Sequence, residues 1–573
     1  MSDTTDLISS AYTSGNVTFA GLGSGTDFDT LIEGLVEAES THLNQLKTWK
    51  ATWEEKITAF QELNTAMLSL KTTLEGMDTM NEFLTKAVSS TASSLVTATA
   101  DSTAETGTHK IIVNQLAQNK IMVNNTGYAA STTVVNSSGS DRVLQYVYEG
   151  TTYNITVPNG TTLEGLVNLI NNQPANPGVK AMAISNGTQY YLQFRGLDLG
   201  STATLTIGAG TTLTGYGAAD WTTSQANQNS EIRVDGWPAA SWISNPSNTI
   251  TNAIPGLTLN LKDADPGTTV TLTTDVDQEA VLENVRTFVE QMNTVRSKIQ
   301  ELTKFDDTNQ TGSILTGNYG VGMISQNLKD IVASKGVGFI SYNTLGLTED
   351  AYTSLGQLGI TTDATEGSAT FGLLVLDEEI LTEALTDDPT AVAKLFSADY
   401  VGESKSPSFT YLSHIDGTTQ AGEYSVQVTV ASNGSGIASA TINGHPALIS
   451  SAWEITGASG TAEAGLAIRL DTHTAGSTYQ GVVTLKLGKT GELAKELKDL
   501  TNSTDGPLAI LEDNYKDITD SIDDKIAYEE DRLSKYESNL KDKFSRLDTL
   551  LGYYEQIASQ LTSSIDQLSS SNS

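Results

Sequence analysis

The sequence predicts a multidomain α+β protein. Its N-terminal, central and C-terminal helices would form a long coiled-coil or bundle leg, with β-rich lobes inserted between them. Apolar residues spaced three and four apart recur near both ends and in the middle of the chain, as in helices that pack along one another. The stretches between them alternate in polarity between turns rich in Gly, Asn and Pro, which is typical of short strands. The length of 573 residues corresponds to about four domains.

Residues 1–45 are expected to form a flexible terminal region with one short amphipathic helix. Residues 1–18 are rich in Ser, Thr, Asn and Gly without any period, so we expect them to be disordered. A glycine-rich break at 21–26 precedes Asp27, whose carboxylate can cap a helix. The apolar residues that follow lie at helical spacing: Phe28, Leu31, Ile32, Leu35 and Val36.

Residues 46–86 are expected to contain the N-terminal helix of the leg. An apolar stripe with spacings of three and four runs over 46–74, and Gly76 is a suitable helix end. The following region, 87–274, is expected to hold one or two β-rich domains. Its clearest strands are 109–113 and 257–261, and a helix over 163–170 interrupts them.

Residues 275–400 are expected to be the central helical part of the bundle. Residues 378–396 should be helical as well, and a second β-rich lobe is expected at 401–490, with its clearest strand over 424–430. The central seam has a strict 4-3-4-3 spacing: Val281, Val285, Phe288, Met292, Val295, Ile299 and Leu302.

Residues 491–573 are expected to form one long C-terminal helix. A nearly continuous apolar stripe over 508–568 would make a helix about 90 Å long. Acid-first pairs such as Asp531 and Lys535 each stabilise it by about 0.2–0.5 kcal/mol. No globular domain of ordinary size needs such a helix, so it must lie against other long helices.

The two outermost apolar segments, 28–36 and about 554–568, have no evident partner within a three-helix leg. Such faces are expected of a self-assembling subunit, because they become buried only against neighbouring molecules. The alternative is that both ends pack on their own bundle.

Charge and composition exclude several classes of protein. With 68 acidic and 32 basic residues, the chain has a net charge of −36 and would repel nucleic acids and anionic lipid. It has no Cys, which excludes disulfides, thiolate metal ligands and Cys nucleophiles. Residues 1–25 do not resemble a cleavable signal peptide, and no stretch approaches the roughly 20 apolar residues of a membrane span. We therefore expect no membrane insertion, and any export should use another route.

No residue pattern predicts a catalytic site, a cofactor or a metal, so we expect that the protein is not an enzyme. The glycines at 21, 23 and 25 do not match a nucleotide-binding loop. Asp307-x-Asn309 begins like a calcium loop, but the twelfth position is Asn318 rather than Glu. The histidines are scattered and lack metal-ligand spacing: His42, His109, His414, His445 and His473.

Several blocks of this sequence resemble flagellar filament-capping proteins, the FliD family. The first is Gly21-Leu22-Gly23-Ser24-Gly25-Thr26-Asp27-Phe28-Asp29, and the others occur in the family's order over most of the chain. The insert at 401–487 and the segment 551–555 depart from the family pattern. The remaining blocks lie at 107–117, 163–201, 249–261, 288–293 and 358–396.

This resemblance implies an extracellular structural protein at the tip of the bacterial flagellum, exported without a cleavable signal peptide. It would form a homo-oligomeric ring, commonly a pentamer, that promotes folding and insertion of exported flagellin and prevents its loss. Its implied partners are flagellin, the hook–filament junction proteins and, before secretion, an export chaperone. We expect the filament contacts at the two terminal apolar segments: Phe28, Leu31, Ile32, Leu35, Leu561, Ile565 and Leu568.

Three alternatives remain at this stage. The β lobes could belong to a surface adhesin that binds glycans or mucin, or to a carbohydrate-active enzyme. A flagellin or a junction protein is a nearer alternative, which the family blocks disfavour.

Overall fold

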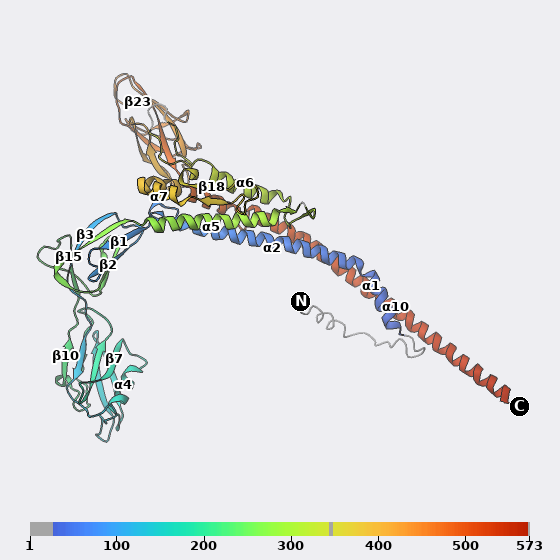
Figure 1. Cartoon of the computed structure of the whole chain (residues 1–573), viewed down its shortest axis with the longest axis horizontal. Coiled ribbons are helices and arrows are strands. Elements are labelled where there is room, and N and C mark those ends of the chain that lie inside the picture. Colours follow the sequence, from blue (N-terminus) through green and yellow to red (C-terminus); the bar gives the residue numbers. More distant parts are fainter. Residues whose placement is uncertain (1–26, 307, 343–347, 571–573) are drawn as a thin grey trace.

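The chain forms a helical shaft with β-rich lobes at one end and a long helix, α10 (Pro507–Ser570), projecting from the other (Figure 1). The computed structural model describes residues 27–306, 308–342 and 348–570. The expected disorder of 1–18 therefore lies outside the described residues. The mixture of helices and several sheets agrees with the α+β class predicted from the sequence.

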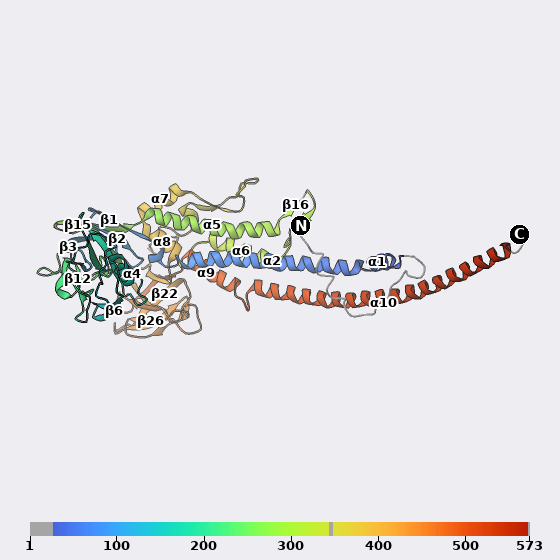
Figure 2. The ribbon, with the colours of Figure 1, turned by 90° about the horizontal axis from the view of Figure 1, so that it is seen from below.

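The helix α2 (Thr41–Glu75) is the central element of the shaft. It contacts α10, α5 (Gln278–Thr303) and α9 (Lys489–Leu500), and both views show α2, α5 and α10 side by side (Figures 1 and 2). The other helices outside the lobes, within the described residues, are α1 (Phe28–Glu39), α3 (Met80–Phe83), α6 (Tyr319–Ala333), α7 (Glu378–Asp387), α8 (Pro389–Ser397) and the short 3₁₀ turn η2 (Leu355–Leu358).

One hydrophobic core fills the part of the shaft nearest the lobes. The seven seam residues predicted for α5 are all buried in it, and α2 contributes Phe60, Leu63, Met67, Leu70 and Leu74. Trp49, which the sequence places in the same stripe, is 46% exposed. The reason is that α5 ends at Thr303, so the first turns of α2 have α10 rather than α5 beside them.

Two helix ends follow from local chemistry. Gly76 closes α2, as expected, with its N–H bonded to the Thr73 carbonyl. The helical stretch expected over 378–396 is divided into α7 and α8 at Asp388. The Asp388 carboxylate accepts the Ala391 N–H, and Pro389 occupies the first turn, where its missing N–H costs nothing.

The inner lobe (residues 86–118 and 228–276) consists of two antiparallel sheets over one core. A five-stranded sheet has the order β1-β15-β3-β11-β12, and a three-stranded sheet has the order β13-β14-β2. Its strands are β1 (Lys86–Ser90), β2 (Val96–Ala100), β3 (Gly107–Gln115), β11 (Ser230–Val234), β12 (Ile243–Asn245), β13 (Thr249–Ile254), β14 (Leu257–Leu261) and β15 (Asp265–Val276).

The outer lobe (residues 119–227) has a separate core, so the region expected to hold one or two β-rich domains contains two cores. Its sheets have the orders β10-β4-β8-β7 and β6-β5-β9, and the predicted helix α4 (Leu163–Asn171) packs on β7. The strands are β4 (Ile121–Asn124), β5 (Arg142–Tyr148), β6 (Thr151–Val157), β7 (Val179–Ser185), β8 (Tyr190–Gly196), β9 (Leu205–Ile207) and β10 (Trp221–Gln225), preceded by the turn η1 (Ala218–Asp220).

The inserted lobe (residues 401–487) also has its own core. Its sheets have the orders β20-β28-β22-β23-β24 and β21-β27-β26-β25, and two small hairpins, β16-β17 and β18-β19, lie outside it. The strands are β20 (Val401–Ser404), β21 (Phe409–Ser413), β22 (Gly422–Val430), β23 (Ile437–Ile442), β24 (His445–Pro446), β25 (Leu448–Ile449), β26 (Glu454–Thr456), β27 (Ala467–Leu470), β28 (Thr478–Lys486), β16 (Phe305–Asp306), β17 (Thr311–Gly312), β18 (Ile360–Thr362) and β19 (Leu374–Leu376).

Each lobe begins and ends at one place, where its first and last segments pair. Lys86 lies opposite Val276 at the root of the inner lobe, and Gln118 bridges Gln228 where the outer lobe starts. Val401 lies opposite Lys486 at the root of the inserted lobe. Each lobe is thus an insertion whose first and last residues lie side by side at its root.

Candidate assembly surface

The first half of α10 is covered by α2. Leu508, Ile522, Leu533 and Leu540 of α10 are buried. The Tyr515 ring lies 4.9 Å from the Trp53 ring and 5.3 Å from the Phe60 ring, measured between centroids. Ion pairs border this seam: Lys50 with Asp523 at 2.8 Å, and Lys47 with Glu530 at 2.9 Å.

The helix α1 continues this covering along α10. The Phe28 ring stacks on the Phe544 ring at 5.2 Å, and both Phe28 and Ile32 are buried. At the other end of α1, the Arg532 guanidinium lies 3.2 Å from the Glu39 carboxylate. The expectation that 28–36 lacks a partner within its own chain is therefore wrong, because α10 is long enough to cover α1 as well as α2.

The start of α1 is held by a local cap. The Asp27 carboxylate accepts hydrogen bonds from the Thr30 hydroxyl at 2.6 Å and from the Thr30 N–H at 3.2 Å. These bonds lower the pKa of Asp27, and its negative charge lies at the positive end of the α1 dipole. This cap confirms the prediction made for Asp27.

The predicted contact residues fall into two groups. Phe28 and Ile32 point into the α1/α10 contact, whereas Leu31 and Leu35 are 51% and 41% exposed. Leu561 and Ile565 of α10 are 62% and 56% exposed. Leu568 lies within α10, but its side chain is outside the described residues.

Beyond α1 the last part of α10 stands clear of the shaft (Figure 2). Every residue over 553–567 is exposed. Between 549 and 567 the only charged residues are Glu555 and Asp566, so burial of this surface would require little charge desolvation. Its apolar residues keep spacings of three and four and form what we call the distal stripe: Leu547, Leu550, Tyr554, Ile557, Leu561 and Ile565.

The contact residues predicted from the sequence did not include Leu547, Leu550, Tyr554 or Ile557 of the distal stripe. The signal that finds them is the continuous spacing 547-550-554-557-561-565. An apolar helical face of this length in water is typical of a surface that is buried in an assembly.

The described residues offer little for catalysis or metal binding. No group of three or more His, Asp or Glu side chains among them could hold a metal ion. His109 and His445 are each paired with one carboxylate, of Asp235 at 2.8 Å and of Glu463 at 2.6 Å. Asp307 of the calcium-like segment lies outside the described residues. No helix in the described ranges is long and apolar enough to cross a membrane.

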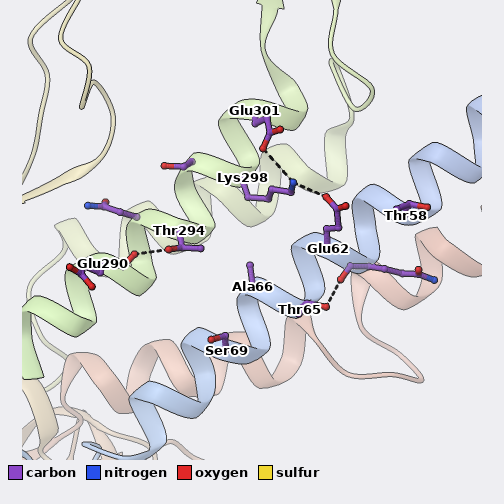
Figure 3. A pocket seen from close by; sticks show the side chains of 12 residues that line it. Thr58, Glu62, Thr65, Ala66, Ser69, Glu290, Thr294, Lys298 and Glu301 are labelled. Carbon is purple, nitrogen blue, oxygen red and sulfur yellow. Dashed lines mark hydrogen bonds and ion pairs between the residues drawn. The ribbon is translucent and has the colours of Figure 1, made fainter. Parts of the chain in front are cut away.

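A groove between α2 and α5 has a volume of about 1040 Å³ (Figure 3). Its lining consists of Thr, Ser, Asn, Gln and Ala side chains and a few charges. The Lys298 ammonium lies 2.7 Å from the Glu62 carboxylate and 3.3 Å from that of Glu301. No histidine lines this groove, and its side chains do not form a nucleophile–base pair.

A shaft with an exposed apolar end and three β lobes defines a structural protein that assembles with others. Residues 24–120 match the family model of the flagellar hook-associated protein 2 N-terminus, and residues 227–556 match that of its C-terminus. The chain belongs to the flagellar hook-associated protein 2 family, FliD, so the family resemblance found in the sequence is confirmed. The stretch between the two models, 121–226, corresponds to the outer lobe.

The chain is also similar to individual proteins of known sequence or structure. The chain is 26% identical to the B-type flagellar hook-associated protein 2 of Pseudomonas aeruginosa, over 66% of this chain and 80% of that protein. It is 26% identical to flagellar hook-associated protein 2 of Escherichia coli K12, over 69% and 82%. The solved D1-D2-D3 domains of the E. coli flagellar cap protein FliD give a TM-score of 0.46 at 27% identity, covering 60% of this chain and 91% of that one.

Membership of this family identifies the chain as a flagellar filament cap protein. The family is one of structural proteins, and the adhesin alternative finds no support among these relatives.

Proposed function

We propose that the chain caps the distal end of the flagellar filament as a ring of identical subunits, commonly a pentamer, and attaches to the filament through the distal stripe. The observation that carries this proposal is the exposure of the stripe on the free part of α10. A helix end of this kind can insert between helices of neighbouring molecules, which would cover its apolar face.

In this proposal the chain is divided as the sequence predicts. Residues 46–86, 275–400 and 491–573 form a coiled-coil leg, 1–45 are the terminal region that carries the short helix, and 87–274 and 401–490 form the lobes that close the ring. Flagellin emerging beneath the ring folds there and inserts, and the hook–filament junction proteins bind the leg before the filament grows. The chain reaches the tip of the flagellum without a cleavable signal peptide, after release from an export chaperone. It has no catalytic role.

The test uses a strain that lacks this chain and is complemented with variants. The double variant Leu561→Ser/Ile565→Ser should fold normally but release flagellin monomer into the medium, as the deletion strain is also expected to do. The matched control is Leu448→Ser/Ile449→Ser, two exposed residues of the same types on the inserted lobe, which should restore filaments. Normal filaments with the distal-stripe variant would exclude the stripe as the filament contact.

A separate variant tests the contribution of α1. Leu31→Ser/Leu35→Ser changes only exposed side chains of α1, so folding should be retained. If α1 contributes to filament attachment, this variant should release flagellin as well. Full filament length with it would restrict the contact to α10.

A further inference from the structure

The groove between α2 and α5 is longer than a single cavity. A second cavity of about 460 Å³ shares Thr58, Glu62, Lys298 and Glu301 with the first, so the two lie next to each other along the same pair of helices. Together they extend along α2 from Ala51 to Ser69, which is about 27 Å at the helical rise. This length matches a helix of about 18 residues. We call this feature the α2/α5 groove.

The groove has the shape of a helix-binding surface. Thr65, Ala66 and Ser69 of α2 line the first cavity (Figure 3), and Ala59 of the same helix lines the second. Short side chains between the ridges of two neighbouring helices leave room for the larger side chains of a third helix. The first cavity is lined by residues of α2 and α5 alone, so the α2/α5 groove is an open position of the shaft.

The charge of the groove selects the kind of helix that fits. The Lys298 ammonium is already bound by the Glu62 and Glu301 carboxylates. Glu54 is in turn paired with Lys50 at 3.4 Å. The carboxylates of the groove still outnumber its ammonium groups, so the surface is acidic and favours basic side chains at the edges of a bound helix. Five carboxylates and one ammonium line it: Glu54, Glu55, Glu62, Glu290, Glu301 and Lys298.

We propose that the α2/α5 groove binds an amphipathic helix of a different protein, with large apolar side chains toward the groove floor and Lys or Arg along its edges. A second copy of this chain is a poor occupant. α1 contains no Lys or Arg, and neither does 547–567 of α10, so both would be repelled by the groove. The groove is separate from the distal stripe, and this proposal does not depend on the filament contact.

The test uses the full chain and a synthetic probe. The probe is an 18-residue amphipathic peptide with Leu at spacings of three and four and Lys on both flanks. Its partner probe has the same Leu residues and Glu flanks. Fluorescence anisotropy at fixed ionic strength should show binding of the Lys peptide and at least tenfold weaker binding of the Glu peptide. Absence of binding by the Lys peptide would overturn the proposal.

Charge variants distinguish the groove from the general acidity of the chain. Glu55→Lys/Glu290→Lys reverses two exposed groove charges and should weaken binding at least tenfold. Glu105→Lys/Glu366→Lys makes the same change in net charge at exposed positions elsewhere and should leave binding within twofold. Equal losses in the two variants would mean that the peptide binds the overall field, and would overturn the proposal.

A steric variant tests the position of the probe. Ala66→Trp fills the floor of the groove and should abolish binding, whereas Ala558→Trp on the free part of α10 should have no effect. Far-UV circular dichroism shows whether each variant is folded. If Ala66→Trp does not fold, the exposed charge variants still test the proposal. Retained binding by folded Ala66→Trp, or a groove-dependent dimer of the chain in sedimentation, would contradict the proposed occupant.

Discussion

Phe28 shows how one side chain attaches the first helix to the molecule. Its ring is buried against Phe544, while Leu31, one turn further on, is half exposed. The periodicity of α1 predicts that both residues lie on an apolar face. Only the position of α10 distinguishes the buried residue from the exposed one.

We expect Phe28→Ala to release α1 from α10 without unfolding the shaft. Removing a buried Phe side chain costs about 3 kcal/mol. Amide hydrogen exchange over 28–39 should therefore become about 100-fold faster, with little change elsewhere. Leu31→Ala is the matched control and should change exchange less than threefold, because surface substitutions usually cost less than about 0.5 kcal/mol. Equal effects of the two variants would mean that the aromatic stack does not hold α1.

Glu403 lies in an ionic cluster at the root of the inserted lobe. Its carboxylate is 2.6 Å from the buried Lys486 ammonium, and Lys486 also lies 2.6 Å from Asp350. Lys405 is 2.6 Å from the same Asp350 oxygen. Burial alone would raise the pKa of Glu403, but hydrogen bonds from Lys394 and Lys486 hold it at about 2. The cluster therefore ties the lobe to the 348–353 segment and to α8.

This cluster makes stability depend on pH. The pKa of Glu403 is lower in the folded chain than its ordinary 4.5, so its contribution is complete above pH 4.5 and is lost as pH falls toward about 2. A shift of this size corresponds to about 3 kcal/mol. Glu403→Gln should thus destabilise the protein at pH 7 by about that amount, and the difference from the parent should shrink as pH falls from 4.5 to 2. Urea denaturation at several pH values measures this, with Glu366→Gln as the exposed control.

Among the elements, α10 has two different environments along its length. The part of α10 that ends near Phe544 is covered by α2 and α1, whereas every residue over 553–567 is exposed. The sequence stripe looks the same over both halves. A 64-residue helix can therefore be read from the sequence, but the point where its covering ends cannot.

Truncation of α10 distinguishes the two halves. Removal of 553–573 should change the melting temperature by no more than about 1 °C, since no described side chain of 553–567 is buried. Removal of 533–573 should lower it clearly and release α1, because it deletes Leu533, Leu540 and Phe544. Differential scanning calorimetry compares the two truncations. A large loss with the shorter deletion would indicate that the distal stripe is buried in the isolated protein.

Several element boundaries follow from local sequence alone. The α5 seam, the Asp27 cap and the end of α2 at Gly76 are where the sequence predicts them. The division of 378–396 was missed although Asp388 and Pro389 are a clear start signal for a new helix.

The whole molecule is built by nested insertion. Because the first and last residues of each lobe pair with each other, the chain segments on either side of the lobe lie close together at its root. At the inserted lobe the Gly488 N–H donates to the Ala398 carbonyl at 2.7 Å, next to the pairing of Val401 with Lys486. This geometry predicts that the inserted lobe can be deleted without unfolding the rest of the chain.

We expect a chain in which 401–486 is replaced by a short Gly-Ser linker to keep the folded shaft and inner lobe. Its melting transition should remain cooperative, and its near-UV circular dichroism should retain the signals of the remaining aromatic residues. A deletion of the same length shifted to 409–494 cuts into α9 and leaves an incomplete sheet, so it should not fold. Failure of the in-register deletion would mean that the shaft needs the lobe for its stability.

The sequence by itself determined the kind of each long element, the family and the acidic charge. These depend on residue spacing, local capping and ordered motifs, which the chain carries regardless of its partners. Only the tertiary structure decided that Phe28 and Ile32 are covered while Leu561 and Ile565 are free, and that α2 and α5 leave an acidic groove between them. The physical reason is that periodicity specifies which face of a helix is apolar, whereas the arrangement of neighbouring elements determines what, if anything, covers that face.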